Sequence, residues 1–329
     1  MPTHVMLTRP AANRVYGEQA AALATAELAI CLSTAEDIKL AQIAGLEYVS
    51  FDLAKLSPGE LQIIAEQSTC YALFRRDGGA LRPIELPDPF LFSDDLVTIP
   101  KYQGKTNEQF TRLLLNVTLA AVSRPATGPR RILDPLAGRG TTLATALLSG
   151  HHGYGIERDV KAFEQQAAFI KTYLRRKHIK HSAELSPLRR EGKTIGKRFT
   201  ASINSAAGPL TLDTMTGDAT DSPRLFGKRK FDAIITDAPY GVAHAATANG
   251  GRSRSPGDLL RAAIPGWAEQ LMHGGALGIS WNTYGITRDD LGELLTASGL
   301  QVATSEPWLG FAHRVDSSIR RDLIVATKP

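Results

Sequence analysis

The chain has 329 residues, a formal net charge of +5 and a hydrophobic fraction of 43%, values that exclude a disordered, fibrous or disulfide-stapled protein. Its only two cysteines, Cys31 and Cys70, lie far apart, so neither a disulfide framework nor a zinc site is expected. The sequence begins without a secretory signal and has no stretch of ~18 uninterrupted apolar residues, which spanning a bilayer requires, so we expect a cytoplasmic protein.

The first hundred residues predict a small α+β domain. An apolar run at Val5 to Leu7 is followed by a helical stretch over residues 12–28. The runs 71–75 and 81–86 flank Asp77-Gly78-Gly79, a turn signal that predicts a hairpin. Several prolines then make residues 87–100 irregular. We therefore place a domain boundary in this segment, with a small N-terminal domain at 1–97 and a second domain at 98–329.

The second domain shows alternating helix and strand patterns. Helices are expected over residues 107–122, 141–148 and 161–174. Strands are expected at 132–133, 152–156, 210–212, 231–236, 276–281 and 323–326. This alternation predicts an α/β fold with a mostly parallel sheet that is covered on both faces. In such sheets a ligand binds beyond the carboxyl ends of the strands.

The first of these strands ends in a glycine-bearing turn with the sequence Asp134-Pro135-Leu136-Ala137-Gly138-Arg139-Gly140-Thr141. Two glycines allow the backbone to turn tightly and to approach a ligand closely, and the acid at the strand end can hold a cationic amino group. A dinucleotide fingerprint is absent, since the third glycine is missing. The cofactor-binding candidates in this turn are Asp134, Pro135, Ala137, Gly138, Gly140 and Thr141. An ordinary tight turn is the alternative.

Two further acids follow strands. Glu157, in the sequence Gly155-Ile156-Glu157-Arg158, could accept both ribose hydroxyls of a nucleoside. Asp218 could lie beside an adenine amino group. The candidates at these two turns are Glu157, Arg158, Asp218 and Ala219. The alternative for Glu157 is an ordinary surface acid, and the alternative for Asp218 is a polar turn without a ligand.

The strand 231–236 runs directly into Asp237-Ala238-Pro239-Tyr240. An exocyclic amino group conjugated to a ring is a poor nucleophile until acceptors fix its hydrogens. The Asp237 carboxylate and a backbone carbonyl near Ala238 could accept those hydrogens and leave the nitrogen lone pair facing a methyl donor. Tyr240 offers a flat face for a base. Asp237, Pro239 and Tyr240 are therefore the catalytic candidates.

The sequence Asp237-Ala238-Pro239-Tyr240 closely resembles the Asp-Pro-Pro-Tyr motif of S-adenosylmethionine-dependent amino-methyltransferases. Residues 98–329, with the four motifs in this order, resemble the tRNA guanine-N2 methyltransferase family. Two flanking segments, 102–106 and 313–321, are also similar to that family. The resemblance implies a Rossmann-like class I methyltransferase fold with a seven-stranded sheet and an antiparallel last strand. It also implies S-adenosyl-L-methionine as cofactor and a flipped-out base as acceptor.

The chain departs from the family in two respects. Ala238 stands where the family has proline. The alanine is expected to leave the backbone looser than proline would. The family's RNA-binding THUMP domain is incomplete or absent, because only about 95 residues precede the catalytic part. RNA binding would then depend on residues 171–200, which carry ten basic and two acidic side chains, and on Arg252, Arg254 and residues 228–230. Such a patch is typical of a surface that meets phosphates, and a solvated surface is the alternative.

Several functions remain open on this evidence. The expected one is methylation of an exocyclic amino group of a nucleic-acid base, namely guanine N2 in tRNA, in a protein that takes part in tRNA processing. The alternatives are a DNA adenine-N6 or cytosine-N4 methyltransferase, methylation of a protein glutamine, and a catalytically silent nucleic-acid-binding module. The loop 242–256 is a candidate substrate gate, and its His244 could assist proton removal. No histidine cluster has the spacing of a metal site, so no metal is expected.

Overall fold

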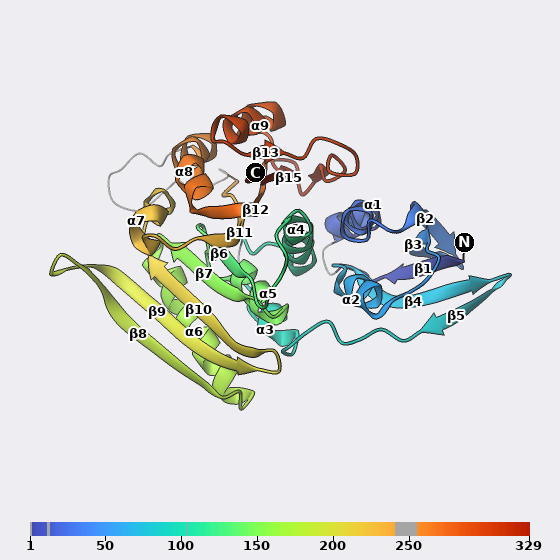
Figure 1. Ribbon diagram of the computed structural model, residues 1–329, viewed down its shortest axis with the longest axis horizontal. Helices are drawn as coiled ribbons and strands as arrows, with labels where there is room; N and C mark the ends of the chain where they lie inside the picture. Colours follow the sequence, from blue (N-terminus) through green and yellow to red (C-terminus); the bar gives the residue numbers. More distant parts are fainter. Residues whose placement is uncertain (1, 12–13, 103, 241–254) are drawn as a thin grey trace.

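The computed structural model describes residues 2–11, 14–102, 104–240 and 255–329, which form two β-sheets and the helices packed on them (Figure 1). The N-terminal sheet has the strand order β2-β3-β1-β4-β5 and only antiparallel pairs. Its strands are β1 (Thr3–Thr8), β2 (Glu36–Ile43), β3 (Leu46–Asp52), β4 (Cys70–Asp77) and β5 (Ala80–Ile84). The expected hairpin is thus confirmed as β4 and β5.

Helix α1 (Arg14–Cys31) lies between this sheet and the rest of the chain (Figure 1). One row of its side chains, including Leu28, packs under the N-terminal sheet with Phe51. Another row, including Leu23, packs against α4 (Glu108–Ala120). The buried Glu27 carboxylate accepts a hydrogen bond from Asn116 of α4 at 2.7 Å. Because α1 contributes to both cores, the division into two domains near residue 97 remains a proposal.

The second sheet contains a seven-stranded core with the order β13-β15-β12-β11-β6-β7-β10. Only β15 runs antiparallel to its neighbours in that set. The fold is therefore α/β and Rossmann-like, with the sheet expected of a class I methyltransferase. Its strands are β6 (Arg131–Asp134), β7 (His152–Glu157), β10 (Gly208–Thr216), β11 (Phe231–Asp237), β12 (Leu271–Asn282), β13 (Gln301–Val302) and β15 (Arg320–Thr327), and β14 (His313–Arg314) pairs with β15.

Helices cover both faces of this sheet, as the alternating pattern predicted. In β11, Ala233 and Ile235 face the cluster of α4, whereas Ile234 faces the opposite cluster. One face carries α4, α5 (Thr141–Leu148) and α6 (Val160–Arg176). The other carries α7 (Ser222–Phe226), α8 (Pro256–Gln270) and α9 (Arg288–Ala297). This layering leaves the carboxyl ends of the parallel strands at one edge.

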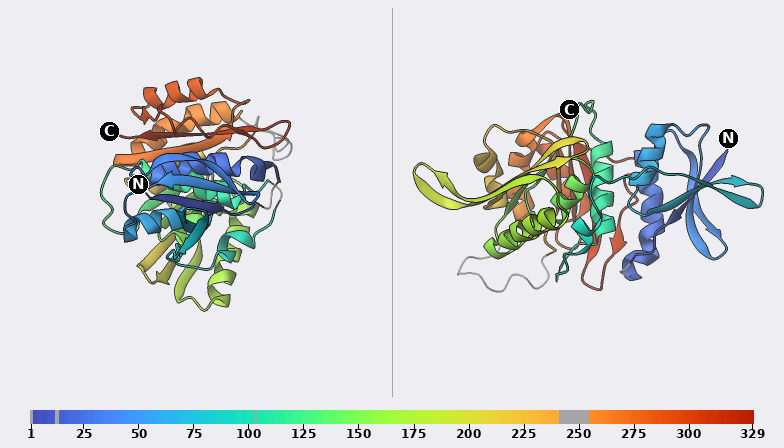
Figure 2. Two further views of the ribbon diagram at one scale, coloured as in Figure 1. Left: turned by 90° about the vertical axis from the view of Figure 1, so that its right-hand side faces the viewer. Right: turned by 90° about the horizontal axis from the view of Figure 1, so that it is seen from below.

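The basic segment 171–200 is helical at its start, as expected from the helix 161–174, but the structure of its remainder was not predicted. Its first part is the end of α6, and the rest belongs to a long antiparallel hairpin of β8 (His181–Arg190) and β9 (Lys193–Ser205). Strand β9 pairs with β10 and so extends the sheet. The hairpin projects from the end of the molecule opposite the N-terminal sheet (Figures 1 and 2).

Other boundaries differ by a few residues. Strand β10 is longer than the expected 210–212, and α1 ends later than the expected 12–28. Helices α2 (Pro58–Glu66), α8 and α9 were not predicted, and the short α3 (Asp95–Thr98) interrupts the segment expected to be irregular. Among the residues described, no helix is long and apolar enough to cross a membrane.

Candidate functional site

A pocket of about 300 Å³ lies at the carboxyl ends of β6, β7, β10 and β11. Its volume is at the lower end of the range of small-molecule sites, about 300–1,000 Å³. The predicted site residues that line it are Pro135, Glu157, Arg158, Asp218, Ala219, Asp237 and Pro239. The sequence analysis did not select four further lining residues, Leu136, Ile156, Gly217 and Leu259. The structure therefore brings cofactor candidates and catalytic candidates into one pocket.

Asp134 ends β6 but does not line this pocket. Its side chain is 2% exposed and accepts hydrogen bonds from the Leu136 backbone N–H at 3.0 Å and the Thr236 hydroxyl at 2.8 Å. Burial is the main reason why the pKa of Asp134 rises to about 7, and the negative charge of Asp237 adds to the rise. The carboxyl group is thus close to half protonated at neutral pH. Its role toward a cationic amino group remains a prediction.

The two glycines of the turn have left-handed backbone conformations, with φ of 53° at Gly138 and 83° at Gly140. A Cβ on Gly138 would meet nothing within 4 Å, so a ligand can approach the backbone there. A Cβ on Gly140 would lie 2.3 Å from the amide nitrogen of Gln166. Both positions therefore favour glycine, one for its conformation alone and one also for space.

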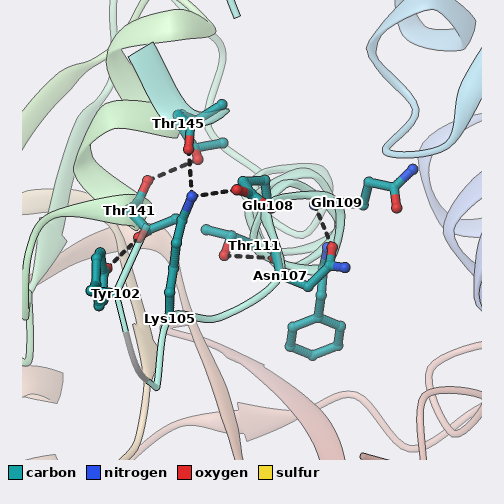
Figure 3. Close-up of polar contacts among 10 residues, drawn as sticks. Tyr102, Lys105, Asn107, Glu108, Gln109, Thr111, Thr141 and Thr145 are labelled. Carbon is teal, nitrogen blue, oxygen red and sulfur yellow. Dashed lines mark hydrogen bonds and ion pairs between the residues drawn. The ribbon is translucent and has the colours of Figure 1, made fainter. Parts of the chain in front are cut away.

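Thr141, which follows the two glycines, contacts Tyr102 from an earlier segment of the chain. The hydroxyl groups of Thr141 and Tyr102 lie 2.9 Å apart (Figure 3), and the Arg139 guanidinium lies 4.5 Å from the centre of the Tyr102 ring. Ala137 is 6% exposed. Tyr102 thus packs beside the glycine turn, although Ala137 and Thr141 do not line the pocket.

Glu157 and Asp218 end neighbouring strands and face the same pocket. The two oxygens of Glu157 accept the backbone N–H groups of Gly138 and Asp159, each at 2.6 Å. Burial raises the pKa of Glu157. Asp218 accepts the backbone N–H of Thr220 at 3.0 Å and its hydroxyl at 2.6 Å. An ionised carboxylate has about four acceptor sites, so Glu157 retains capacity for ligand hydroxyls.

Asp237 accepts hydrogen bonds from three hydroxyl groups. The Tyr240 hydroxyl lies 2.7 and 2.9 Å from the two carboxylate oxygens and, with its single hydrogen, donates to one of them at a time. Thr106 donates to Oδ2 and Ser280 to Oδ1. With about four acceptor sites on a carboxylate, three donors leave about one for a fourth. The arrangement fixes the carboxylate and keeps one site for a ligand N–H.

Ala238 has a structural role that the sequence analysis did not anticipate. It is 1% exposed, and its backbone N–H donates to the Ser280 carbonyl oxygen at 2.8 Å. Proline has no backbone N–H and could not form this bond. The alanine therefore ties the turn to β12, and the expectation of a looser backbone is wrong at this bond.

The Tyr240 ring is held from several sides. Its hydroxyl is bound to Asp237, and the Arg321 guanidinium lies 5.1 Å from the ring centre. Burial, reinforced by the Asp237 charge, raises its pKa well above the usual value, so the phenol is neutral. Stacking of a base on this ring remains a prediction.

Thr106 and Ser280 were not predicted as partners of Asp237. Ser280 was detectable in principle as a polar residue in the apolar strand 276–281. Thr106 immediately precedes Asn107, which caps α4 by accepting the Gln109 backbone N–H at 2.8 Å (Figure 3). The predictions at His244, at Arg252 and Arg254 and for most of the gate loop 242–256 lie outside the described residues.

No protein-family model and no curated protein matches the chain. Among solved structures it is similar to TrmN from Thermus thermophilus, at 14% identity and a TM-score of 0.46, with 100% of both chains covered. It is also similar to the T. thermophilus 16S rRNA N2 G1207 methyltransferase RsmC, solved with AdoMet and guanosine, at 16% identity and a TM-score of 0.36 over 89% of this chain and 58% of that one. A third similar structure is magnesium protoporphyrin IX methyltransferase from Synechocystis PCC 6803 with bound SAM, at 14% identity and a TM-score of 0.41 over 69% and 87% of the two chains.

Proposed function

We propose that this chain is an S-adenosylmethionine-dependent methyltransferase that acts on an exocyclic amino group of a nucleic-acid base, with guanine N2 of tRNA as the first candidate. The observation that carries the proposal is the shared pocket. Glu157 and Asp218 line it together with Asp237 and Pro239. Cofactor and acceptor would therefore meet without any rearrangement of these strand ends.

The pocket residues fit S-adenosylmethionine. Glu157 would accept the ribose hydroxyls and Asp218 would lie near the adenine amino group. The open space beside Gly138 would allow a ligand to approach the backbone closely. Ile156 and Leu259 supply apolar contacts. When bound, the cofactor supplies an activated methyl group. The protein must then only hold and orient the acceptor nitrogen.

Asp237 would provide that orientation. Its remaining acceptor site can take one amino hydrogen and so hold the nitrogen with its lone pair toward the methyl group. The nitrogen must lose a proton when it gains the methyl group, and the Asp237 carboxylate is placed to receive that proton. The hydroxyl groups of Thr106 and Ser280 keep the carboxylate in this position.

The nucleic acid would bind the projecting β8–β9 hairpin and the adjoining end of α6. Some basic side chains there are already engaged: Lys197 pairs with Glu164, and Arg198 binds Asp213 at 2.7 Å. Other basic side chains are exposed and form no ion pair with a residue that the structure describes, namely Arg175, Arg176, Lys180, Arg189 and Lys193. Those five are available for phosphate contacts.

Replacing Arg189 and Lys193 by glutamate should weaken binding of tRNA. The slope of log K against the logarithm of the salt concentration, where K is the binding constant, should decrease by about one for each phosphate contact that is lost. The measurement is the dissociation constant of unmodified tRNA at several salt concentrations. Glutamate at both Lys55 and Arg76, two exposed basic residues of the N-terminal part, is the matched charge control. An equal effect of the control would show that only total charge matters.

Replacing Glu157 by glutamine should weaken cofactor binding by about 10-fold to 100-fold, because hydrogen bonds to a charged group contribute about 1.5–3 kcal/mol. Isothermal titration with S-adenosylmethionine measures the change. The exposed Glu164→Gln variant, altered on the neighbouring helix, should bind as the wild type does. Unchanged affinity in Glu157→Gln would remove Glu157 from the cofactor site.

The experiment that tests the function is transfer of radiolabelled methyl from S-adenosylmethionine to unmodified tRNA and, in parallel, to unmethylated DNA. Nucleoside analysis then identifies the product. Label in N2-methylguanosine of tRNA is the expected result. Label only in DNA would replace the proposal by adenine-N6 or cytosine-N4 methylation, and cofactor binding without transfer to either would favour a silent binding module.

A further inference from the structure

A second, smaller pocket of about 70 Å³ lies where α1, the start of α4 and the strands β14 and β15 meet. It shares no lining residue with the pocket described above. It nevertheless adjoins the acceptor site, because Arg321 lines it and also contacts the Tyr240 ring. Its polar lining includes Lys105, Asn107, His313 and Arg314.

Arg321 is a buried cation without a counterion among the residues described. It is 5% exposed, and its guanidinium lies 4.4 Å from the centre of the Phe110 ring and 5.1 Å from that of Tyr240. Its Nε has no hydrogen-bond partner. By contrast, Arg288 at the start of α9 binds Asp322, the residue that follows Arg321 on β15, at 2.7 Å. A buried charge is costly unless it is paired, so an anionic ligand would complete this site.

His313 presents an acceptor to the same pocket. It is 4% exposed, and its Nδ1 lies 2.8 Å from the Phe311 carbonyl oxygen. Nδ1 must therefore carry the proton, since the carbonyl can only accept. Burial lowers the pKa of His313 to about 4, so the ring is neutral at pH 7. Its Nε2, which has no partner, then requires a hydroxyl or other donor from a ligand.

The other groups that line the pocket favour an anionic group next to the ligand hydroxyl that donates to His313. Asn107 caps α4 at the pocket, so the positive end of this 13-residue helix faces it. Lys105 binds Glu108 and the Val97 carbonyl (Figure 3), which leaves one of its three N–H groups. Arg314 adds a further positive charge at the pocket lining.

We propose that this pocket binds a phosphate group of the substrate strand through Arg321, while His313 accepts the hydrogen of the neighbouring ribose 2′-hydroxyl. The proposal rests on the proposed function, because it takes a polynucleotide as substrate. The pocket volume of about 70 Å³ is about five to seven times the 10–15 Å³ of accessible space that one water molecule needs, which suits a small anion such as a phosphate group but not a base. Since only RNA carries the 2′-hydroxyl, the site selects RNA over DNA.

The test uses uridine 3′-monophosphate, 2′-deoxyuridine 3′-monophosphate and uridine as probes, titrated calorimetrically at constant ionic strength. Uracil has no exocyclic amino group, so these probes avoid the acceptor chemistry. The wild type should bind the ribonucleotide about 2-fold to 12-fold more tightly than the deoxynucleotide, the range that one hydrogen bond gives, and should bind uridine weakest. Equal binding of all three, or no saturable binding, would overturn the proposal.

Variants assign the contacts. Arg321→Met should abolish binding of both nucleotides, His313→Leu should remove only the preference for the ribonucleotide, and Arg320→Gln, altered at the exposed neighbour on β15, should bind as the wild type does. Unfolding curves establish that each variant is folded. If Arg321→Met does not fold, the ¹⁵N resonance of His313 Nε2 in the wild type serves instead: it should shift with the ribonucleotide and not with uridine, and no shift would contradict the site.

The methyl-transfer assay separates the two proposals. Binding of the nucleotides as described, without methylation of tRNA, would leave the phosphate site intact and overturn the proposed function. Methylation of tRNA with the same KM in the wild type and Arg321→Met would support the function and overturn the phosphate site.

Discussion

Replacing Asp237 by asparagine should lower the rate of methyl transfer by about 10²-fold to 10⁴-fold, the range that a positioned acid or base contributes. Asparagine keeps the size of the side chain but loses the negative charge and one acceptor oxygen. Its amide nitrogen would also face one of the three hydroxyl donors, Thr106, Tyr240 or Ser280. The amino group of the substrate would then lose both its anchor and the acceptor for its proton.

The measurement is kcat with saturating S-adenosylmethionine and tRNA, together with the cofactor dissociation constant. A catalytic role predicts a large fall in kcat and a cofactor affinity close to that of the wild type. The Ser280→Ala variant is an informative companion, because it removes one donor but leaves the carboxylate, so its kcat should fall less. A wild-type rate in Asp237→Asn would exclude Asp237 from the reaction.

The parts of the site that could be predicted are those that lie within short segments of sequence. Glu157 and Asp237 each directly end an apolar strand, and parallel strands bring such ends together at one edge. Their meeting in one pocket follows from that rule. The hydroxyl groups around Asp237 could not be predicted in this way. Thr106 precedes Asp237 by more than a hundred residues and Ser280 lies on the next strand, so only tertiary structure shows that they meet.

The β8–β9 hairpin shows a second limit. β8 and the first half of β9 have no buried residue and carry charged residues and a proline, Pro187. Alternating buried apolar side chains occur only in the second half of β9, at Phe199, Ala201 and Ile203. Strand patterns depend on one buried face, so a largely solvated hairpin at the edge of a sheet leaves little signal. Proline is tolerated at such an edge. The sequence thus identified the charge of the segment but not its form.

The Arg321 pocket illustrates the same point for binding. The segment 313–321 was noted only for its similarity to the close of the tRNA enzymes' catalytic domain. Arg321 in this segment was not expected to be buried, since a charged side chain is rarely buried unless it is paired. The observation that singles out Arg321 is the combination of 5% exposure with an unpartnered Nε, which only coordinates can provide.

Replacing Asp134 by asparagine should abolish a large pH dependence of stability. The native pKa of Asp134 is about 7, against 3.8 when the side chain is unfolded and solvated. Between these values the native state binds more protons than the unfolded state, so the free energy of unfolding falls as pH rises. A difference of about three pKa units corresponds to about 4 kcal/mol, fully present below pH 4 and lost as pH rises through 7. Asparagine does not titrate and lacks this fall.

Urea unfolding of both proteins at intervals from pH 4 to pH 8 measures the effect, since all other titrating groups are common to the two. The stability of Asp134→Asn relative to the wild type should increase across this range, and parallel curves would contradict the raised pKa. Asp316→Asn is the matched control with the opposite sign. Hydrogen bonds from Ser318 lower the pKa of this exposed aspartate, so its contribution is present above pH 4 and lost on acidification.

The same series with bound S-adenosylmethionine tests the predicted role of Asp134 toward the cofactor's amino group. A nearby ammonium favours the ionised carboxylate and lowers its pKa. The cofactor would then raise the free energy of unfolding of the wild type more at pH 8 than at pH 6, because the ligand stabilises a carboxylate charge that burial opposes. Asp134→Asn would show no such difference. An equal gain at both pH values in the wild type would mean that Asp134 supports the turn through Leu136 and Thr236 and does not contact the cofactor.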